Sequence, residues 1–180
     1  MMNDDIEKVL FSQEDIKRRT RELGEQITRD YAGRDIVCLG ILRGCFMFMA
    51  DIVRSIDLNC TVDFMAVSSY GNGTSTTGAV KIGKDISESI EGKHVIIIED
   101  IIDSGHTLVY LKKYLSGMKP ASLAVCTLFD KPSRREVEMN VEYVGFECPN
   151  EFIVGYGLDY AQYYRNLPYI GVLKPEVYEK

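Results

Sequence analysis

The chain contains no tryptophan, two histidines and five prolines in 180 residues. It also lacks any apolar run close to the roughly 20 residues that a helix needs to cross a bilayer. Its N-terminus, MMNDDIEKVLF, is acidic and does not resemble a signal peptide. These absences argue against a membrane span and a secretion signal, so we expect a soluble cytoplasmic protein with no membrane partner.

Basic residues are in deficit, with 21 Lys and Arg against 27 Asp and Glu and a net charge of -6. Broad nucleic-acid binding usually needs a basic face, which this balance does not favour. We therefore expect no nucleic-acid partner, although a local basic patch stays compatible with the composition.

The cysteines are few, odd in number and scattered, and no two have C-x-x-C spacing. Their mostly apolar surroundings favour small buried hydrophobes in a reducing compartment. The two histidines, His94 and His106, cannot complete a zinc site with cysteines so far apart in the sequence. The five cysteines are Cys38, Cys45, Cys60, Cys126 and Cys148.

Apolar runs separated by helical stretches are typical of an α/β domain with a mainly parallel sheet. Ser12 has the pattern of a helix N-cap, followed by acids in the first turn and by apolar residues at helical spacing up to Gly33. No repeat, low-complexity tract or linker divides the chain, so we expect one domain over residues 1–180. Strands are predicted over residues 35–42, 61–69, 94–98 and 122–129, and helices over residues 13–33, 45–56 and 107–116.

Residues 70–79, YGNGTSTTGA, contain three glycines and four consecutive Ser or Thr residues. A segment of this kind has almost nothing to bury in a core. We therefore expect a long mobile loop, or a hairpin with a mobile tip.

The segment IEDIIDSGHT follows the apolar run HVIII and carries three acids before a small, hydroxyl-rich turn. We expect the strand to end at Ile98, which places Glu99 and Asp100 at the carboxyl edge of the sheet, where open parallel sheets bind ligands. The turn that follows leads into a helix whose first N–H groups suit a phosphate. Two hydroxyl donors and a glycine that permits close backbone approach make up this turn: Ser104, Thr107 and Gly105.

The carboxylates would repel a phosphate unless they face another part of the same ligand. Carboxylates accept hydrogen bonds from sugar hydroxyls and bind Mg²⁺ through oxygen. The combination therefore indicates a ligand with a phosphate, a vicinal diol and a metal ion, which describes a phosphorylated ribose. A strand followed by a capped, acid-rich helix start is the alternative that the pattern leaves open. The chain has neither a G-x-x-x-x-G-K-[S/T] loop nor a G-x-G-x-x-G turn after a strand.

The segment VIIIEDIIDSGHT closely resembles the signature of type I phosphoribosyltransferases, which bind phosphoribosyl pyrophosphate (PRPP). Four further segments, in the order found in that family, narrow the resemblance to the hypoxanthine-guanine phosphoribosyltransferases. They are GILRGCFMFMADIVR, SSYGNGTSTTGAVKI, LFDKPSRR and FIVGYGLDYAQYYRNLPYIGVL. The resemblance implies a type I phosphoribosyltransferase fold: a mainly parallel twisted sheet flanked by helices, a small hood built from the chain ends, and a flexible lid loop at about residues 70–79.

The resemblance implies roles for the acids and for the turn after them. Glu99 and Asp100 would hold the ribose hydroxyls and an associated Mg²⁺, and Asp103 would accept the proton from N7 of the purine. Only the backbone N–H of His106 would be needed, and its imidazole would be solvated. The residues implied to wrap the 5′-phosphate are Ser104, Gly105, His106 and Thr107.

Two separate segments are implied to bind pyrophosphate. Leu42-Arg43-Gly44 matches the family's pyrophosphate loop, which often has lysine in place of Arg43 and usually has a cis peptide bond before that residue. Arginine keeps the positive charge but changes the donor geometry. Arg165 would be the second contact, and Ser69 and Tyr70 would touch pyrophosphate from the hinge side of the lid. Without the resemblance, Arg43 would belong to an ordinary strand-end turn and Arg165 would be a surface arginine.

The implied purine contacts come later in the chain. Lys131 would read the exocyclic O6, and because a lysine only donates, it favours a 6-oxo purine over adenine. Phe152 would stack on the base, and the backbone of Ile153, where many relatives have valine, would bind the base edge. Asp159 would lie near the 2-position of the base and bind a second Mg²⁺ through water. Taken alone, Lys131 is more typical of a solvated loop lysine, and Phe152 of core packing.

The resemblance implies purine salvage: Mg²⁺-dependent transfer of the phosphoribosyl group from PRPP to N9 of hypoxanthine or guanine, giving IMP or GMP and pyrophosphate. The alternatives are a xanthine-preferring transferase and a PRPP- or nucleotide-sensing regulator on the same fold. A regulator could lose the lid, the proton acceptor or the base-reading lysine, and this sequence has all three. The family also implies a homodimer or a homotetramer, which no sequence feature distinguishes.

Overall fold

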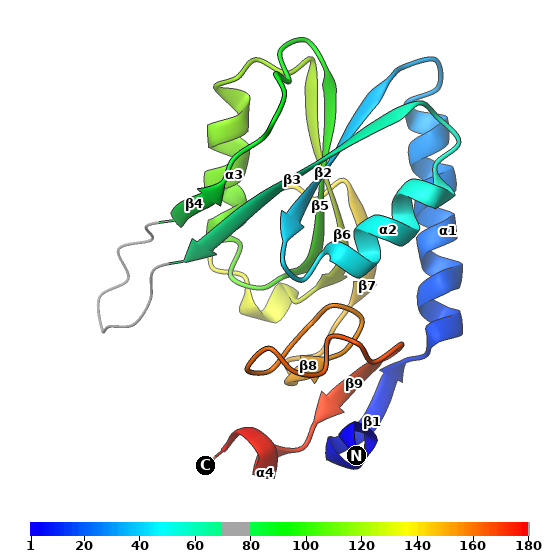
Figure 1. The fold of residues 1–180 in the computed structure, drawn as a ribbon, viewed down its shortest axis with the longest axis vertical. Helices are drawn as coiled ribbons and strands as arrows, with labels where there is room; N and C mark the ends of the chain where they lie inside the picture. Colours follow the sequence, from blue (N-terminus) through cyan, green and yellow to red (C-terminus); the bar gives the residue numbers. More distant parts are fainter. Residues whose placement is uncertain (70–79, 180) are drawn as a thin grey trace.

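The structure is a computed structural model that describes residues 1–69 and 80–179. Its centre is a sheet with the strand order β4-β3-β2-β5-β6-β7 (Figure 1). Neighbouring strands are parallel except for β3 and β4, which are antiparallel. The predicted mainly parallel α/β sheet is therefore confirmed. The strands are β2 (Ile36–Leu42), β3 (Cys60–Ser69), β4 (Val80–Lys84), β5 (His94–Ile102), β6 (Ser122–Asp130) and β7 (Tyr143–Glu147).

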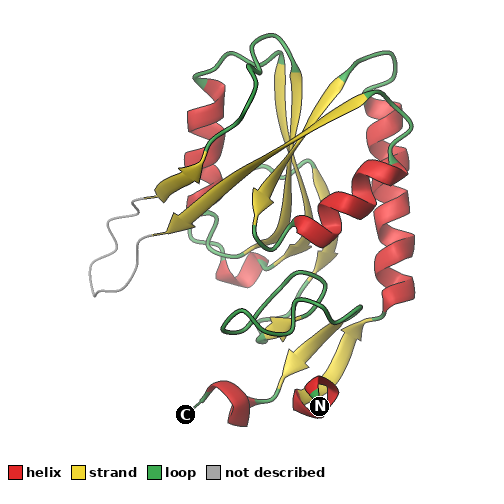
Figure 2. Cartoon of the chain, in the orientation of Figure 1, coloured by secondary structure: helices red, strands yellow, loops and turns green. Residues whose placement is uncertain are grey.

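Helices cover both faces of this sheet (Figures 1 and 2). Alternate residues of β2 show how the faces are divided, because side chains along a strand point to opposite sides. Cys38 belongs to the core cluster that contains Ile16 of α1 and Ile52 of α2, whereas Leu39 belongs to the cluster that contains Leu108 of α3. The helices are α1 (Gln13–Asp30), α2 (Phe46–Ser55) and α3 (His106–Ser116).

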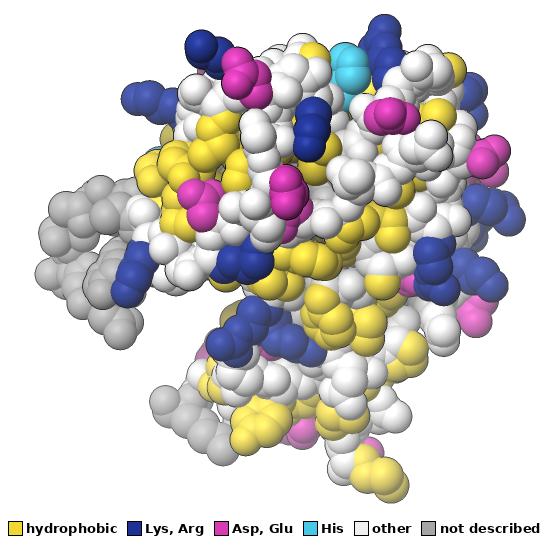
Figure 3. All heavy atoms as spheres, turned by 45° about the horizontal axis from the view of Figure 1, so that its top comes forward, with side chains coloured by type: hydrophobic (Ala, Val, Ile, Leu, Met, Phe, Trp, Pro, Cys, Tyr) yellow, Lys and Arg dark blue, Asp and Glu magenta, His cyan; other side chains and the backbone are white. Residues whose placement is uncertain are grey.

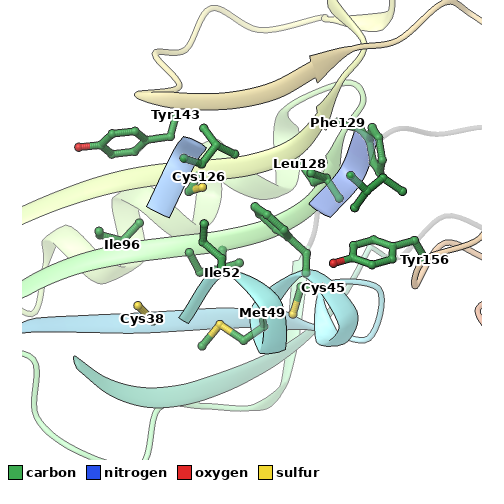
Figure 4. Packing of buried hydrophobic residues seen from close by; sticks show 14 of the residues in the cluster. Cys38, Cys45, Met49, Ile52, Ile96, Cys126, Leu128, Phe129, Tyr143 and Tyr156 are labelled. Carbon is green, nitrogen blue, oxygen red and sulfur yellow. The ribbon is translucent and has the colours of Figure 1, made fainter. Parts of the chain in front are cut away.

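The larger core cluster lies between the sheet and the helices α1 and α2. Figure 4 shows Cys38, Cys45 and Cys126 there, together with Met49 and Ile96. Burial raises the pKa of Cys38 to about 12, so this group stays a neutral thiol at physiological pH. All five cysteines of the chain are free, four of them buried and one partly exposed. The interpretation of the cysteines as small buried hydrophobes is thus confirmed for four of them.

α1 begins as its sequence predicts. The hydroxyl of Ser12 accepts a hydrogen bond from the backbone N–H of Asp15 at 3.1 Å, and the backbone N–H of Ser12 donates to the Asp15 carboxylate at 3.3 Å. This reciprocal capping box satisfies N–H groups that the first helical turn leaves free. The helix ends at Asp30 rather than at Gly33, because Gly33 has a φ of 74° and belongs to the turn that follows.

Strands from both ends of the chain form a second, antiparallel sheet with the order β1-β9-β8, called the terminal sheet below. It lies beyond the carboxyl ends of the central strands (Figure 1). Its strands are β1 (Ile6–Phe11), β8 (Ile153–Val154) and β9 (Ile170–Leu173), and short helices flank both sheets at η1 (Met2–Asp5), η2 (Pro132–Arg134) and α4 (Pro175–Tyr178). In the part of the chain that the structure describes, no helix has the length and apolar character to span a membrane.

Candidate active site

A cavity of about 340 Å³ lies at the carboxyl ends of β2 and β5 and is bordered by the segment between β8 and β9. The space-filling view shows a hollow in the molecule with Lys and Arg side chains beside it (Figure 3). The cavity brings together polar residues from three separate segments, all of which the sequence predicts as site residues. They are Arg43, Glu99, Asp100, Asp103, Ser104, Thr107, Asp159 and Arg165.

The acids Glu99 and Asp100 lie inside β5 and not after it. The apolar run predicts that the strand ends at Ile98. This prediction is wrong, because β5 continues to Ile102. β2 pairs with β5 only as far as Ile98, but β6 continues the ladder on the other side, with Glu99 opposite Thr127. Glu99 and, beyond Asp100, Ile101 therefore have partners in the strand ladder, which holds the backbone on both sides of Asp100.

The two carboxyl groups lie close together and are partly buried. Burial, and then the neighbouring charge of Asp100, raise the pKa of Glu99 well above its ordinary value. Burial also raises the pKa of Asp100, although the N–H of Ile101 donates to it at 2.8 Å and Arg165 acts in the opposite direction. A cation or a set of hydroxyl donors would relieve this unfavourable pairing, so the pair has the chemistry of a cation or diol site.

Gly44 allows the Leu42-Arg43-Gly44 segment to come close to these acids. A Cβ at position 44 would overlap a carboxylate oxygen of Asp100, so a larger residue would displace that carboxylate or the segment itself. The Leu42–Arg43 peptide bond is cis, as the resemblance implies. The side chain of Arg43 is exposed and lines the cavity.

Asp103, Ser104 and Gly105 join β5 to α3. Gly105 is the N-cap of α3 and has a φ of 90°, a conformation that favours glycine; an added Cβ would also meet Arg135 at 3.0 Å. Because glycine has no side chain to cap the helix, the first N–H groups of α3 can serve an anion. α3 begins at His106, whose Nε2 lies 2.9 Å from a carboxylate oxygen of Glu136. This imidazole is half exposed.

Asp103, the predicted proton acceptor, takes part in an exposed ion pair. The Nε of Arg134 donates to its Oδ1 at 3.1 Å, and the Nε of Arg135 donates to its backbone carbonyl at 3.3 Å. Arg135 also pairs with Asp130 at the end of β6. Sequence reasoning missed both arginines, although they stand in the segment LFDKPSRR, which drew attention only through its lysine.

A hydrogen bond from the Lys131 side chain to a backbone carbonyl brings Lys131 close to Phe152. Its Nζ donates to the carbonyl of Glu151 at 2.8 Å, which links the end of β6 to the residue before Phe152. Burial lowers the pKa of Lys131 below its ordinary value. The expected purine contacts Lys131, Phe152 and Ile153 do not line the cavity described above.

Phe152 is not a core residue. Its side chain is 39% exposed and stacks on Tyr178 of α4, with ring centroids 4.8 Å apart and an interplanar angle of 21°. The ring of Tyr160 meets it edge-on at 5.7 Å. Ile153, in contrast, is buried in β8 and pairs with Val172 of β9, so only its backbone is suited to a ligand contact.

Arg43 and Arg165 are joined through a side chain that sequence reasoning missed. The Oε1 of Gln162 accepts from Nη1 of Arg43 at 2.8 Å and from Nη2 of Arg165 at 3.2 Å. Asp159 pairs with Arg165 at 2.8 Å and accepts from the backbone N–H of Gln162 at 2.8 Å. Arg165 also donates to the carbonyl of Gly157 at 2.6 Å. The sequence does show a polar residue, Gln162, between Asp159 and Arg165. Its position in the sequence alone does not show whether its side chain points toward the two arginines.

Ser69 ends β3, where its backbone pairs with Val80 of β4. Tyr70 and the rest of the predicted lid, residues 70–79, lie outside the described residues. The pyrophosphate contacts expected of Ser69 and Tyr70, and the lid itself, therefore stay predictions.

The residues expected to hold Mg²⁺ fit it by chemistry. Glu99 and Asp100 are adjacent oxygen donors whose repulsion a cation would relieve, and Asp159 is a further carboxylate of the cavity. Among residues 1–69 and 80–179, no group of three or more His, Cys, Asp or Glu side chains is close enough to hold a metal ion. Mg²⁺ is usually bound by one or two protein carboxylates together with water and substrate oxygens, which suits an adjacent pair of acids.

Residues 8–161 match the family model of the phosphoribosyl transferase domain. The chain belongs to the phosphoribosyltransferase family. A similar phosphoribosyltransferase is the hypoxanthine-guanine phosphoribosyltransferase of Streptococcus thermophilus (strain CNRZ 1066). It is 53% identical over 180 residues, and the match covers 100% of both chains.

Solved phosphoribosyltransferase structures have the same fold. A hypoxanthine phosphoribosyltransferase from Staphylococcus aureus has a TM-score of 0.96 and 52% identity, covering 99% of this chain and 97% of that one. A hypoxanthine-guanine phosphoribosyltransferase from Bacillus anthracis, with a HEPES molecule in the active site, has a TM-score of 0.91 and 51% identity, covering 94% of this chain and 99% of that one. The predicted resemblance and the predicted type I fold are confirmed.

Proposed function

We propose that this phosphoribosyltransferase acts in purine salvage and transfers the 5-phosphoribosyl group of PRPP to N9 of hypoxanthine or guanine. The products are IMP or GMP and pyrophosphate. The observation that carries the proposal is one cavity lined by the acid pair of β5, the turn before α3 and two arginines from other segments. PRPP has a diol, a phosphate and a diphosphate, and each of these has a chemical complement in that cavity.

The ribose phosphate occupies the part of the cavity made by the end of β5 and the start of α3. The N–H groups at the start of α3 and the hydroxyls of Ser104 and Thr107 donate to the 5′-phosphate. The ribose hydroxyls donate to Glu99 and Asp100, which accept through ionised oxygens. Binding of these donors stabilises the charged forms of the two acids, whose pKa values are raised in their absence.

Departure of pyrophosphate develops positive charge on the ribose and negative charge on the leaving group. Arg43 and Arg165, which both line the cavity, stabilise that negative charge. Glu99 and Asp100 would hold one Mg²⁺, and Asp159 would bind a second through water; when bound, these ions would supply further positive charge for the leaving group. The protein's own part is to keep the diphosphate in line with C1 of the ribose while the bond breaks.

The purine binds between the cavity and the terminal sheet. Lys131 has three N–H donors, of which one is used by the carbonyl of Glu151, so two remain for O6 of the base. Phe152 stacks on the base, the backbone of Ile153 meets its edge, and Asp159 lies near its 2-position. Asp103 accepts the N7 proton as N9 attacks the ribose, exchanging its contact with Arg134 for one with the base.

We place this reaction in the cytoplasm, because free cysteine thiols persist in a reducing compartment. The whole chain acts as one phosphoribosyltransferase domain, assembled as a homodimer or a homotetramer. Light scattering on a gel-filtration column distinguishes these two states, and a monomeric mass would contradict both.

A panel of purines tests the function directly. Hypoxanthine, guanine, xanthine and adenine are each supplied with PRPP and Mg²⁺, and pyrophosphate release is measured. We expect release with hypoxanthine and guanine and none with adenine. Release with xanthine alone would favour the xanthine-preferring alternative. Binding of PRPP without release on any purine would favour a sensor.

A further inference from the structure

The side chain of Gln162 stands between the two arginines of the cavity. Its single Oε1 accepts from Arg43 at 2.8 Å and from Arg165 at 3.2 Å. Arg43 follows β2 and Arg165 precedes β9, so these two cations come from opposite parts of the chain. The oxygen of Gln162 therefore bridges the two guanidinium groups.

The backbone of Gln162 is itself held in place. Its N–H donates to a carboxylate oxygen of Asp159 at 2.8 Å, and its φ is 74°, which is uncommon for a residue other than glycine. Asp159 in turn pairs with Arg165 at 2.8 Å. The backbone of Gln162 is thus fixed by Asp159, which also pairs with Arg165 in the same hydrogen-bond network.

The neutrality of this acceptor matters for an anionic ligand. A carboxylate at the same place would form charge-assisted pairs with both guanidinium groups and cancel their charge. An amide oxygen accepts the same hydrogen bonds without adding a negative charge. With Asp159 already paired to Arg165, glutamine at position 162 leaves Arg43 without a carboxylate of its own in this network.

We propose that Gln162 is a positioning residue for the diphosphate of PRPP, which rests on the proposed function and deepens it. Its amide oxygen holds the guanidinium groups of Arg43 and Arg165 at one spacing and leaves their charge to the substrate. Each guanidinium has five N–H donors, so most of them stay available to diphosphate oxygens. Affinity for PRPP and for pyrophosphate depends on residue 162, whereas affinity for the purine does not.

Two substitutions separate charge from hydrogen bonding. Gln162→Glu keeps the length and the acceptor but adds a negative charge, and Gln162→Met keeps the length and removes the acceptor. We expect the KM for PRPP to rise roughly 10- to 100-fold in Gln162→Glu, because two charged hydrogen bonds now compete with the substrate. We expect a smaller rise of about 3- to 10-fold in Gln162→Met, because only neutral-acceptor hydrogen bonds are lost. The KM for hypoxanthine should stay unchanged in both.

The order of these effects decides the question. A purely structural role predicts the reverse order, since Glu keeps both hydrogen bonds and Met loses them. A KM for PRPP in Gln162→Glu equal to that of the wild type, or lower than that of Gln162→Met, would overturn the proposal. Gln13→Glu, which adds the same charge to an exposed residue at the start of α1, is the matched control and should leave the KM for PRPP unchanged.

Calorimetric binding of pyrophosphate with Mg²⁺ keeps this test separate from that of the reaction. We expect the dissociation constant to rise in the order wild type, Gln162→Met, Gln162→Glu. If the three proteins show this order of pyrophosphate affinity but the wild type transfers ribose phosphate to no purine, the proposed function is overturned and the role of Gln162 is supported. Equal affinities in all three, or no pyrophosphate binding by the wild type, would overturn the role of Gln162. Gln162 is exposed, and melting temperatures near that of the wild type would show that both variants fold.

Discussion

The ribose side of the cavity and its pyrophosphate side are built in different ways. On the ribose side, the residues from Glu99 to Thr107 form one continuous stretch across the end of β5 and the start of α3. On the pyrophosphate side, Arg43 and Gln162 touch although 119 positions separate them. The first side is held by a strand ladder and a helix N-terminus, and the second by hydrogen bonds between long side chains.

This difference has a consequence for how each side responds to substitution. Groups held by backbone hydrogen bonds have little freedom to adjust, so changes there should have large effects. Groups held by exposed side-chain contacts can rearrange, so changes there should have graded effects. Gly44 is where the two sides meet, because its missing Cβ leaves room for Asp100.

The largest effect is expected for Asp103→Asn on the ribose side. An amide cannot accept the N7 proton, so we expect kcat to fall roughly 10²- to 10⁴-fold with little change in PRPP affinity. Steady-state kinetics and equilibrium binding of PRPP measure the two quantities. Asp57→Asn, at an exposed position outside the cavity, is the control. Unchanged turnover would exclude Asp103 as the proton acceptor.

Gly44→Ala should break the contact between the two sides. The added methyl group overlaps the Asp100 carboxylate, so the pyrophosphate segment or the acid pair must move. We expect kcat/KM for PRPP to fall roughly 100-fold, the scale of a displacement of about 1 Å at a reacting centre. Gly83→Ala is the matched control, because its Cβ would meet only a carbonyl at 3.6 Å. If both variants behave like the wild type, the close approach of the two segments is not required.

Lys131→Ala tests the base-reading residue, which lies outside the cavity lining. We expect the KM for hypoxanthine and guanine to rise by about 10-fold, since a donor to O6 is lost. The KM for PRPP should stay the same. Lys113→Ala, on the exposed side of α3, is the control. An unchanged KM for both purines would show that another group reads O6.

The smallest effect is expected in the stability of the metal-free protein. The raised pKa of Glu99 means that the folded chain binds this proton more tightly than the unfolded chain, so ionisation of Glu99 opposes folding. Its unfavourable contribution is absent below the ordinary value of 4.5 and grows as pH rises toward the raised pKa. Glu99→Gln should therefore melt higher than the wild type at pH 8 by about 2–4 °C, for roughly 1 kcal/mol, and lose that advantage near pH 4.

Calorimetric melting scans in buffer with a chelator measure this difference. Glu25→Gln, an exposed residue of α1, should leave the melting temperature within about 1 °C of the wild type. A difference between Glu99→Gln and the wild type that is the same at both pH values would show that ionisation is not its cause.

Local patterns predicted the central strands β2, β3, β5 and β6 and the helices α1, α2 and α3, but not β4 or β7. The family resemblance implied every polar residue that lines the cavity. The patterns also fell short in the placement of single residues. They failed where a distant partner decides. β5 continues past Ile98 because β6 pairs with it as far as Ile102, which lies opposite Asp130. The apolar run of β5 alone cannot show that this partner strand is present. β1 was not predicted, because its partner β9 comes from the other end of the chain. Gln162 and Arg134 were missed because each is identified by the side chain it touches.

Apolar runs were enough to predict the fold class, and the stretch from Glu99 to Thr107 with the other matching segments was enough to predict the family, because each of these patterns lies within one segment of the chain. Only the folded chain brings Arg43, Gln162 and Arg165 together and closes the terminal sheet from both chain ends. Contacts of this kind depend on which side chains meet after the core has packed. No pattern within one segment specifies that meeting.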